Sequence, residues 1–373
     1  MTSAGPRPRS GPRPRSGPRL RTLPRPGTAT RKRFGALAVG IVAVIVAVVA
    51  GVAFGAAALP PGSVAAELAN LIPGVHLHSG LDERQIAIVT QLRLPRVVLA
   101  LLVGAMLGLA GGAYQGVFRN PLADPHLLGV AAGAGLGVSA LVAFGRGPAS
   151  LSGLPPGAPV AAFVGALVAV TMTYLLGGLG GRDRSPATLI LAGVAVSAFL
   201  AAGQTYVMQR NVDDLREIYS WLLGRLATAG WHDTLLLLPY ATVSATAILL
   251  LRRELDVLSV GDEEAAGLGL HPQRSRYILL GAASLGTAAA VSVSGLIGSV
   301  GLVVPHTVRL LAGYSYRVIL PLSMLYGGAF LVLADLAGRV LASPAEIPIG
   351  VVTAFCGAPF FAVVLRTTSR MSS

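Results

Sequence analysis

Long apolar runs separated by short breaks rich in proline, glycine or charge make up most of the chain from residue 34 onward. A helix needs about 20 residues to cross the hydrocarbon core of a bilayer, and most of these runs are that long. The pattern predicts an all-α polytopic membrane protein with about ten transmembrane helices. Their expected ranges are 34–59, 97–117, 126–144, 159–179, 187–208, 233–251, 277–293, 296–312, 318–340 and 347–365.

Composition agrees with a membrane location. Of the 373 residues, 53% are hydrophobic and 12% are charged, and mean hydropathy is +0.70. One water-soluble core could not bury so much apolar surface. The single cysteine, Cys356, lies in an apolar run, which excludes an intramolecular disulfide and makes a cysteine-based metal site implausible.

Much of the net charge of +13 comes from residues 1–33, which carry nine arginines, one lysine and no acid. Because this segment is rich in proline and poor in large apolar residues, we expect a disordered basic tail. It lacks the interleaved aromatic residues that would favour nucleic-acid binding. The ten-span domain then covers residues 34–366. Its first run is too long for the core of a typical signal peptide, so we expect it to be retained.

Basic residues also indicate the orientation. With ten spans, twenty basic residues fall on the side of the N-terminus and seven on the other side. Because cytoplasmic loops carry the excess of lysine and arginine, we expect both termini in the cytoplasm.

The run at 97–117 has glycine at every fourth position: Gly104, Gly108, Gly112 and Gly116. Glycines at this spacing share one helix face and let another helix backbone approach closely. They are typical of an ordinary packing seam as well as of a specialised transporter helix. The flanking RLPR at 93–96 and the RNPLADP at 119–125 favour the second interpretation.

In the RNPLADP segment, Asn120 and Asp124 each precede a proline. Short polar side chains before proline suit helix starts, because they can accept hydrogen bonds from free backbone amides. This double break at the expected cytoplasmic end of a span could be a gate, and a plain re-entrant turn is the alternative.

Residues 252–276 form a polar cytoplasmic segment whose core, GDEEAAGLG at 261–269, predicts a short helix with acids at its start and glycine at its end. We expect a surface for a soluble partner, with a simple solvated connector as the alternative. In the ninth run, Asp335 and Arg339 stand four residues apart. They could neutralise each other or serve at the outer mouth of the protein.

Motifs for catalysis are missing from the sequence. Lys32 is the only lysine and is followed by Arg33, so the chain has no phosphate-binding loop of the GxxxxGK[ST] type. The six histidines are not at metal-ligand spacing. We therefore expect neither a metal site nor an enzymatic activity.

Several motifs together resemble the permease family of iron-siderophore, haem and cobalamin ABC importers, often called the FecCD or BtuC type. They are RLPR at 93–96, NPLADPHLLG at 120–129, LILAGVA at 189–195, GDEEAAGLG at 261–269, GLIGSVGLVVPHTVRLL at 295–311, LADLAGR at 333–339 and PAEIPIGVVTAFCGAPFF at 344–361. The resemblance covers nearly everything from residue 93 onward.

The resemblance implies a type II ABC importer permease fold in a bacterial plasma (inner) membrane. Two permease copies, identical or paralogous, would pair with ATPase subunits that bind the ATP and with a periplasmic-type or lipoprotein binding protein; this chain would hold no cofactor. The implied binding-protein contacts are Arg93, Arg96 and Arg339. The implied gate comprises Asn120, Leu122, Ser185 and Pro186, although a Ser-Pro pair stands here where relatives have Ser-Thr. The implied ATPase coupling residues are Asp262, Glu263, Ala265, Gly267 and Gly269.

Iron-siderophore is the expected cargo, with haem or cobalamin as alternatives. Two other classes stay open from the residues: an ion-coupled secondary transporter, and a scaffold whose basic tail recruits an acidic partner.

Overall fold

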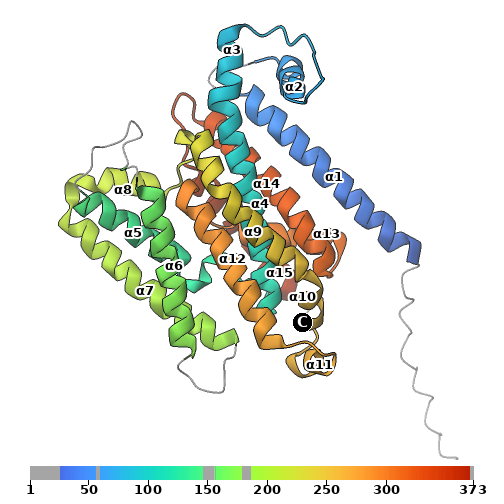
Figure 1. The fold of residues 1–373 in the computed structure, drawn as a ribbon, viewed down its shortest axis with the longest axis vertical. Helices are drawn as coiled ribbons and strands as arrows, with labels where there is room; N and C mark the ends of the chain where they lie inside the picture. Colours follow the sequence, from blue (N-terminus) through green and yellow to red (C-terminus); the bar gives the residue numbers. More distant parts are fainter. Residues whose placement is uncertain (1–25, 56–58, 146–154, 156, 179–185, 370–373) are drawn as a thin grey trace, which may run out of the picture.

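The computed structural model describes residues 26–55, 59–145, 155, 157–178 and 186–369, and these contain helices and connecting segments but no β-strand (Figure 1). Within this part of the chain, seven helices are long and apolar enough to cross a membrane. They are α1 (Pro26–Ala53), α4 (Leu94–Val117), α6 (Ala158–Gly178), α7 (Pro186–Arg210), α9 (Trp231–Leu250), α12 (Pro272–Ser294) and α14 (Tyr316–Leu341).

Three further helices with shorter apolar stretches complete the set: α5 (Val130–Phe144), α13 (Val300–Ala312) and α15 (Ile349–Ser369), which is apolar over Ile349–Ala362. The ten apolar helices match the ten expected runs in order, so the predicted fold class is confirmed. The predicted boundary of the tail is wrong, because α1 begins at Pro26 and residues 26–33 are helical. The rest of the expected tail, residues 1–25, lies outside the described residues.

Short elements lie at the two ends of the bundle. Figure 1 places α2 (Pro61–Asn70) and α3 (Glu83–Ala87) at one end, and α10 (Arg252–Leu258) and α11 (Asp262–Gly267) at the other. We call these the α2–α3 end and the α10–α11 end. Helix α1 begins and α15 finishes towards the α10–α11 end (Figure 1). The remaining short elements are the π-helical turn η1 (Ile88–Arg93), η2 (Pro125–Leu128), η3 (Val212–Asp214), α8 (Leu215–Leu222) and η4 (Leu226–Thr228).

Helix α4 forms the centre of the larger part of the bundle and packs against α14, α12, α13 and α9. Its glycines make these contacts possible. A Cβ added at Gly104 would meet the carbonyl oxygen of Gly327 on α14, and one added at Gly108 would meet the carbonyl oxygen of Ser323. At Gly112 the nearest atom would be Leu320 Cδ2 at 2.9 Å. The four glycines at 104, 108, 112 and 116 therefore lie where neighbouring elements approach most closely.

Other close approaches were not singled out in the sequence. Gly111 of α4 lies against the backbone of Gly301 on α13, and Gly133 of α5 lies against the backbone of Gly165 on α6. The second contact joins α5 and α6 in the smaller group of helices that also contains α7. Small residues line the contacts in both groups. Lipid is as apolar as the side chains, so the hydrophobic effect does not drive helices together in a membrane, and close van der Waals contact between them stabilises the bundle instead.

Candidate functional site

The RLPR motif lies inside a helix that is longer than a membrane requires. Residues Glu83–Val117 form 35 consecutive helical residues, which span about 52 Å at 1.5 Å per residue. The helix starts with a capping box, in which Asp82 accepts from the Gln85 backbone at 2.7 Å and the Gln85 side chain accepts from the Asp82 backbone at 3.1 Å. The 24-residue α4 part alone spans about 36 Å, which already exceeds a bilayer core of about 30 Å. Arg93 and Arg96, at the start of α4, therefore lie near the rim of that core.

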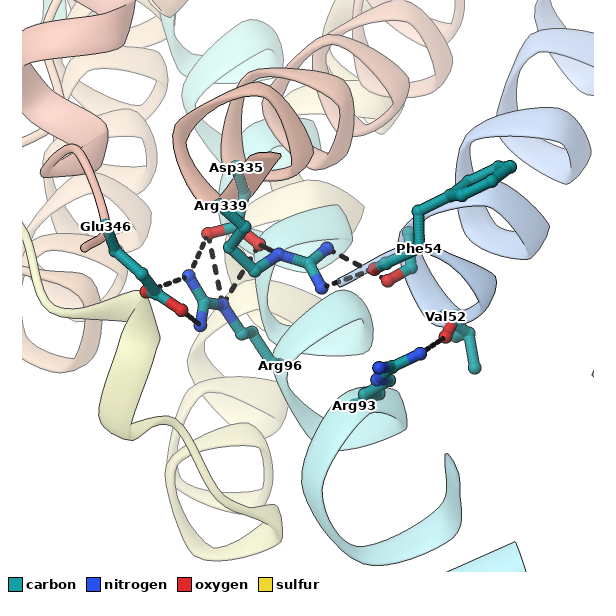
Figure 2. A network of polar contacts seen from close by, with 8 residues as sticks. Val52, Phe54, Arg93, Arg96, Asp335, Arg339 and Glu346 are labelled. Atoms are coloured by element: carbon teal, nitrogen blue, oxygen red, sulfur yellow. Dashed lines mark hydrogen bonds and ion pairs between the residues drawn. The ribbon is translucent and has the colours of Figure 1, made fainter. Parts of the chain in front are cut away.

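Arg96 joins two carboxylates (Figure 2). Its Nε and Nη2 donate to Asp335 on α14 at 2.8–3.1 Å, and its Nη1 and Nη2 donate to Glu346 at 3.1 and 2.8 Å. The Asp335 side chain is only 3% exposed. Bidentate pairs of this kind are the strongest charge-assisted hydrogen bonds that arginine forms.

Arg93 and Arg339 hold the end of α1. Nη1 of Arg93 donates to the carbonyl oxygen of Val52 at 2.8 Å, and Nη1 of Arg339 donates to that of Phe54 at 3.2 Å (Figure 2). Nη1 of Arg93 also donates to the carbonyl oxygen of Ala53 at 2.9 Å, and Nη2 of Arg339 to that of Gly51 at 2.9 Å. The last carbonyls of a helix have no partner within the helix and attract positive charge, so these two side chains stabilise the C-terminus of α1.

The ion pair expected between Asp335 and Arg339 is present, with 3.1 Å between Arg339 Nε and Asp335 Oδ2. The structure brings together the three arginines that the resemblance assigns to a binding protein, but each is engaged by groups of its own chain. Their docking role stays a prediction. Glu346 was missed in the sequence; an acid opening the last apolar run, in PAEIP, is the signal that could have indicated it.

At the α10–α11 end, Asp262 is the centre of a second ionic cluster. Nη2 of Arg276, which is buried on α12, donates to Asp262 Oδ1 and Oδ2 at 3.0 and 3.1 Å. Arg119 also donates to Asp262, and its Nε donates to the carbonyl oxygen of Leu258 at 2.7 Å. Asp262 thus connects α11 both to α12 and to the turn that follows α4.

Arg119 opens the turn that contains the expected gate. Its φ of 48° lies in the left-handed region that non-glycine residues rarely adopt. The Asn120 side chain accepts from the Leu122 backbone at 2.9 Å, and Asp124 caps η2 by accepting from the His126 backbone at 2.7 Å. The turn is therefore held by its own side chains, as the sequence suggested.

The structure describes three of the four residues of the expected gate. Asn120 and Leu122 are exposed at the turn. Pro186 is the first residue of α7, and Ser185 lies outside the described residues. The gate assignment stays a prediction.

Helix α11 presents a small exposed surface. Ala265 is buried and fixes the helix to the body, whereas Glu263 and Gly267 are exposed. Gly269, at φ 83°, ends the helix in a Schellman motif, in which the Gly269 and Leu270 amides donate to the carbonyls of Ala266 and Ala265. Leu268 beside it is 72% exposed. Sequence reasoning did not single out this exposed leucine, which suits contact with a partner protein.

Burial raises the pKa of Asp262, but the hydrogen bonds and positive charges of Arg276 and Arg119 outweigh it and hold the pKa below its ordinary 3.8. A lowered pKa contributes stability that is complete above the unfolded value and is lost as pH falls through the folded value. We therefore expect Asp262→Asn to lower the thermal unfolding midpoint at pH 7, and the difference from the parent to shrink below about pH 4. Glu263→Gln, an exposed neighbour, serves as the control. A difference that is constant from pH 7 to pH 3 would contradict the role of the Asp262 charge.

Among the residues that the structure describes, no group of three or more histidine, cysteine, aspartate or glutamate side chains could hold a metal ion. What the two clusters can do is electrostatic and mechanical: they tie α1, α4 and α14 together at one end, and α4, α11 and α12 at the other.

Comparison with known proteins identifies the fold. The model of the FecCD transport family matches residues 43–367. Over 290 residues the chain is 43% identical to the cobalamin import system permease protein BtuC of Halobacterium salinarum, covering 78% of this chain and 76% of that protein. It is 36% identical over 348 residues to the Fe(3+)-citrate import system permease protein YfmE of Bacillus subtilis, covering 92% and 98%.

A solved structure, described as an inward-facing conformation of a metal-chelate type ABC transporter, superposes with a TM-score of 0.76 at 29% identity, covering 91% of this chain and 99% of that one. These matches favour the importer permease over the secondary transporter and the scaffold that the residues alone left open. The chain is a permease subunit of an ABC importer, a transporter and not an enzyme, and it belongs to the FecCD transport family.

Proposed function

We propose that this permease moves a metal chelate into the cytoplasm by alternating access, with an iron-siderophore as its cargo and haem or cobalamin as the alternatives. The support is chemical as well as comparative: relatives are named for Fe(3+)-citrate and cobalamin, and the chain's own spans are apolar and rich in small residues. ATP is bound by a separate ATPase subunit, and this chain holds no cofactor. A second permease copy or a paralogue completes the path.

The observation that carries this proposal is the Asp262 cluster. It joins α11, an exposed helix outside the spans, to Arg119 at the turn of Asn120 and Leu122. An ATPase that moves α11 would therefore pull on the cytoplasmic end of α4, and through it on the gate. In this arrangement the permease spans the inner membrane of a bacterium with both termini in the cytoplasm. The binding protein docks at the α2–α3 end.

The test is uptake into proteoliposomes that contain the permease with its ATPase, supplied outside with the binding protein. Ferric hydroxamate, ferric citrate, haem and cobalamin are offered separately as labelled cargo. We expect uptake of a ferric chelate only with ATP inside and with all three proteins present. Vesicles without the ATPase are the control; uptake by them along an ion gradient would overturn the proposal, and uptake of haem or cobalamin alone would correct the cargo.

A further inference from the structure

The two carboxylates on Arg96 differ in how firmly they are held. Asp335 is 3% exposed, lies on α14 and also pairs with Arg339. Glu346 is 41% exposed and lies on the irregular segment between α14 and α15. An exposed carboxylate with one bonded partner costs far less to move than a buried one with two. If one of them leaves Arg96, it is Glu346.

Both bidentate edges of the Arg96 guanidinium are occupied. The group offers five N–H donors in a fixed fork. Asp335 takes the edge formed by Nε and Nη2, and Glu346 takes the edge formed by Nη1 and Nη2 (Figure 2). A carboxylate from another protein can form a bidentate pair with Arg96 only after one of these two has moved away.

Space for such an exchange exists beside the pair. A cavity of about 260 Å³ adjoins Arg96, and its lining includes Asp335 and Glu346 together with Ser220 and Gly224. A displaced Glu346 side chain, or an incoming acidic one, could occupy it without moving a helix.

We propose that Glu346 is a built-in competitor: in the unbound permease it holds the edge of Arg96 that an acidic side chain of the binding protein takes on docking. This inference depends on the proposed docking of a binding protein at the α2–α3 end. Exchanging one carboxylate for another leaves the charge around Arg96 unchanged, so docking avoids the cost of leaving donors of the largely buried Arg96 unpaired. The competition also weakens docking and speeds release.

The experiment measures binding of the proposed substrate-binding protein, in soluble form, to the purified permease–ATPase complex in nanodiscs. Glu346→Gln removes the competing charge but keeps the side-chain size. We expect it to lower the Kd about two- to fivefold at low salt, equivalent to releasing one partly exposed ion pair. The gain should shrink as salt is raised.

Glu83→Gln is the matched control, because it removes an exposed acid of α3 at the same end. If Glu83→Gln tightens binding equally, the effect is one of general charge and the competition is overturned. Unchanged or weaker binding by Glu346→Gln, with unchanged thermal unfolding, also overturns it and makes Glu346 a positioning residue for Arg96.

Arg96→Gln separates this inference from the proposed function. If the parent binds, and Arg96→Gln assembles with the ATPase but binds the binding protein several-fold more weakly, docking at Arg96 is supported. If Arg96→Gln binds like the parent, docking at this residue fails, and the competition fails with it. If Arg96→Gln weakens binding but Glu346→Gln does not tighten it, docking at Arg96 is supported and only the competition by Glu346 is overturned.

Discussion

Replacing Gly104 with valine should prevent the permease from accumulating in folded form. The added Cβ would meet the backbone carbonyl oxygen of Gly327, and Leu331 Cβ would lie 2.8 Å away. A backbone carbonyl cannot turn aside as a flexible side chain can, so α4 and α14 would have to separate. Overpacking typically costs about 1–3 kcal/mol, and we expect a cost at or above the top of that range. The measurement is the yield of monodisperse protein and its thermal unfolding midpoint in detergent.

Gly281 provides the control, since a Cβ added there meets nothing within 4 Å and it also lies within a long helix, α12. Glycine to alanine in a helix normally stabilises by about 0.5–1 kcal/mol. Gly281→Ala should follow that rule, whereas Gly104→Ala should destabilise. Equal effects of the two alanine substitutions would mean that the contact between α4 and α14 is looser than the structure shows.

Replacing Gly267 with tryptophan should uncouple ATP hydrolysis from transport while leaving the fold intact. Gly267 is an exposed helical residue of α11, and a Cβ added there meets nothing within 4 Å. The substitution therefore strains nothing within the permease, but it places a large ring on the surface proposed to enter the ATPase. We expect cargo imported per ATP hydrolysed to fall at least about tenfold, equivalent to about 1.4 kcal/mol of lost coupling.

Gly267→Ala is the matched control, because it improves helix propensity and adds only a methyl group. It should transport nearly as well as the parent. The measurement is cargo uptake and ATP hydrolysis in the same proteoliposomes, with the unfolding midpoint recorded for each variant. If Gly267→Trp transports normally, α11 is not the coupling surface and returns to being a solvated connector.

The ionic clusters around Asp262 and Asp335 determine which substitutions can report on partner proteins. Asp262 and Asp335 each serve two arginines. Removing either would disturb the fold as well as any partner contact, because a buried arginine left without its carboxylate is costly. Gly267 and Glu346 are exposed, so changes there report on partners instead.

Local pattern determined most of the architecture. The apolar runs predicted the ten helices, because a helix in lipid must satisfy its own backbone and needs a fixed length to cross. The short helix α11 and the turn from Asn120 to Asp124 were also visible, since caps, prolines and glycines act within a few residues. The start of α1 was misplaced because charge alone does not end a helix, and Pro26 suits a first turn.

The tertiary structure alone decided which distant residues meet. Arg96 lies 239 residues from Asp335 and 250 from Glu346, and Arg119 lies 143 from Asp262. The spacing of Asp335 and Arg339 predicted their own pair, but not that Arg339 and Arg93 hold the end of α1. The periodicity of a helix predicts which of its faces carries apolar or small residues. Which helix lies opposite depends on packing summed over the whole bundle. That packing gives the three arginines assigned to a partner hydrogen-bond acceptors within their own chain.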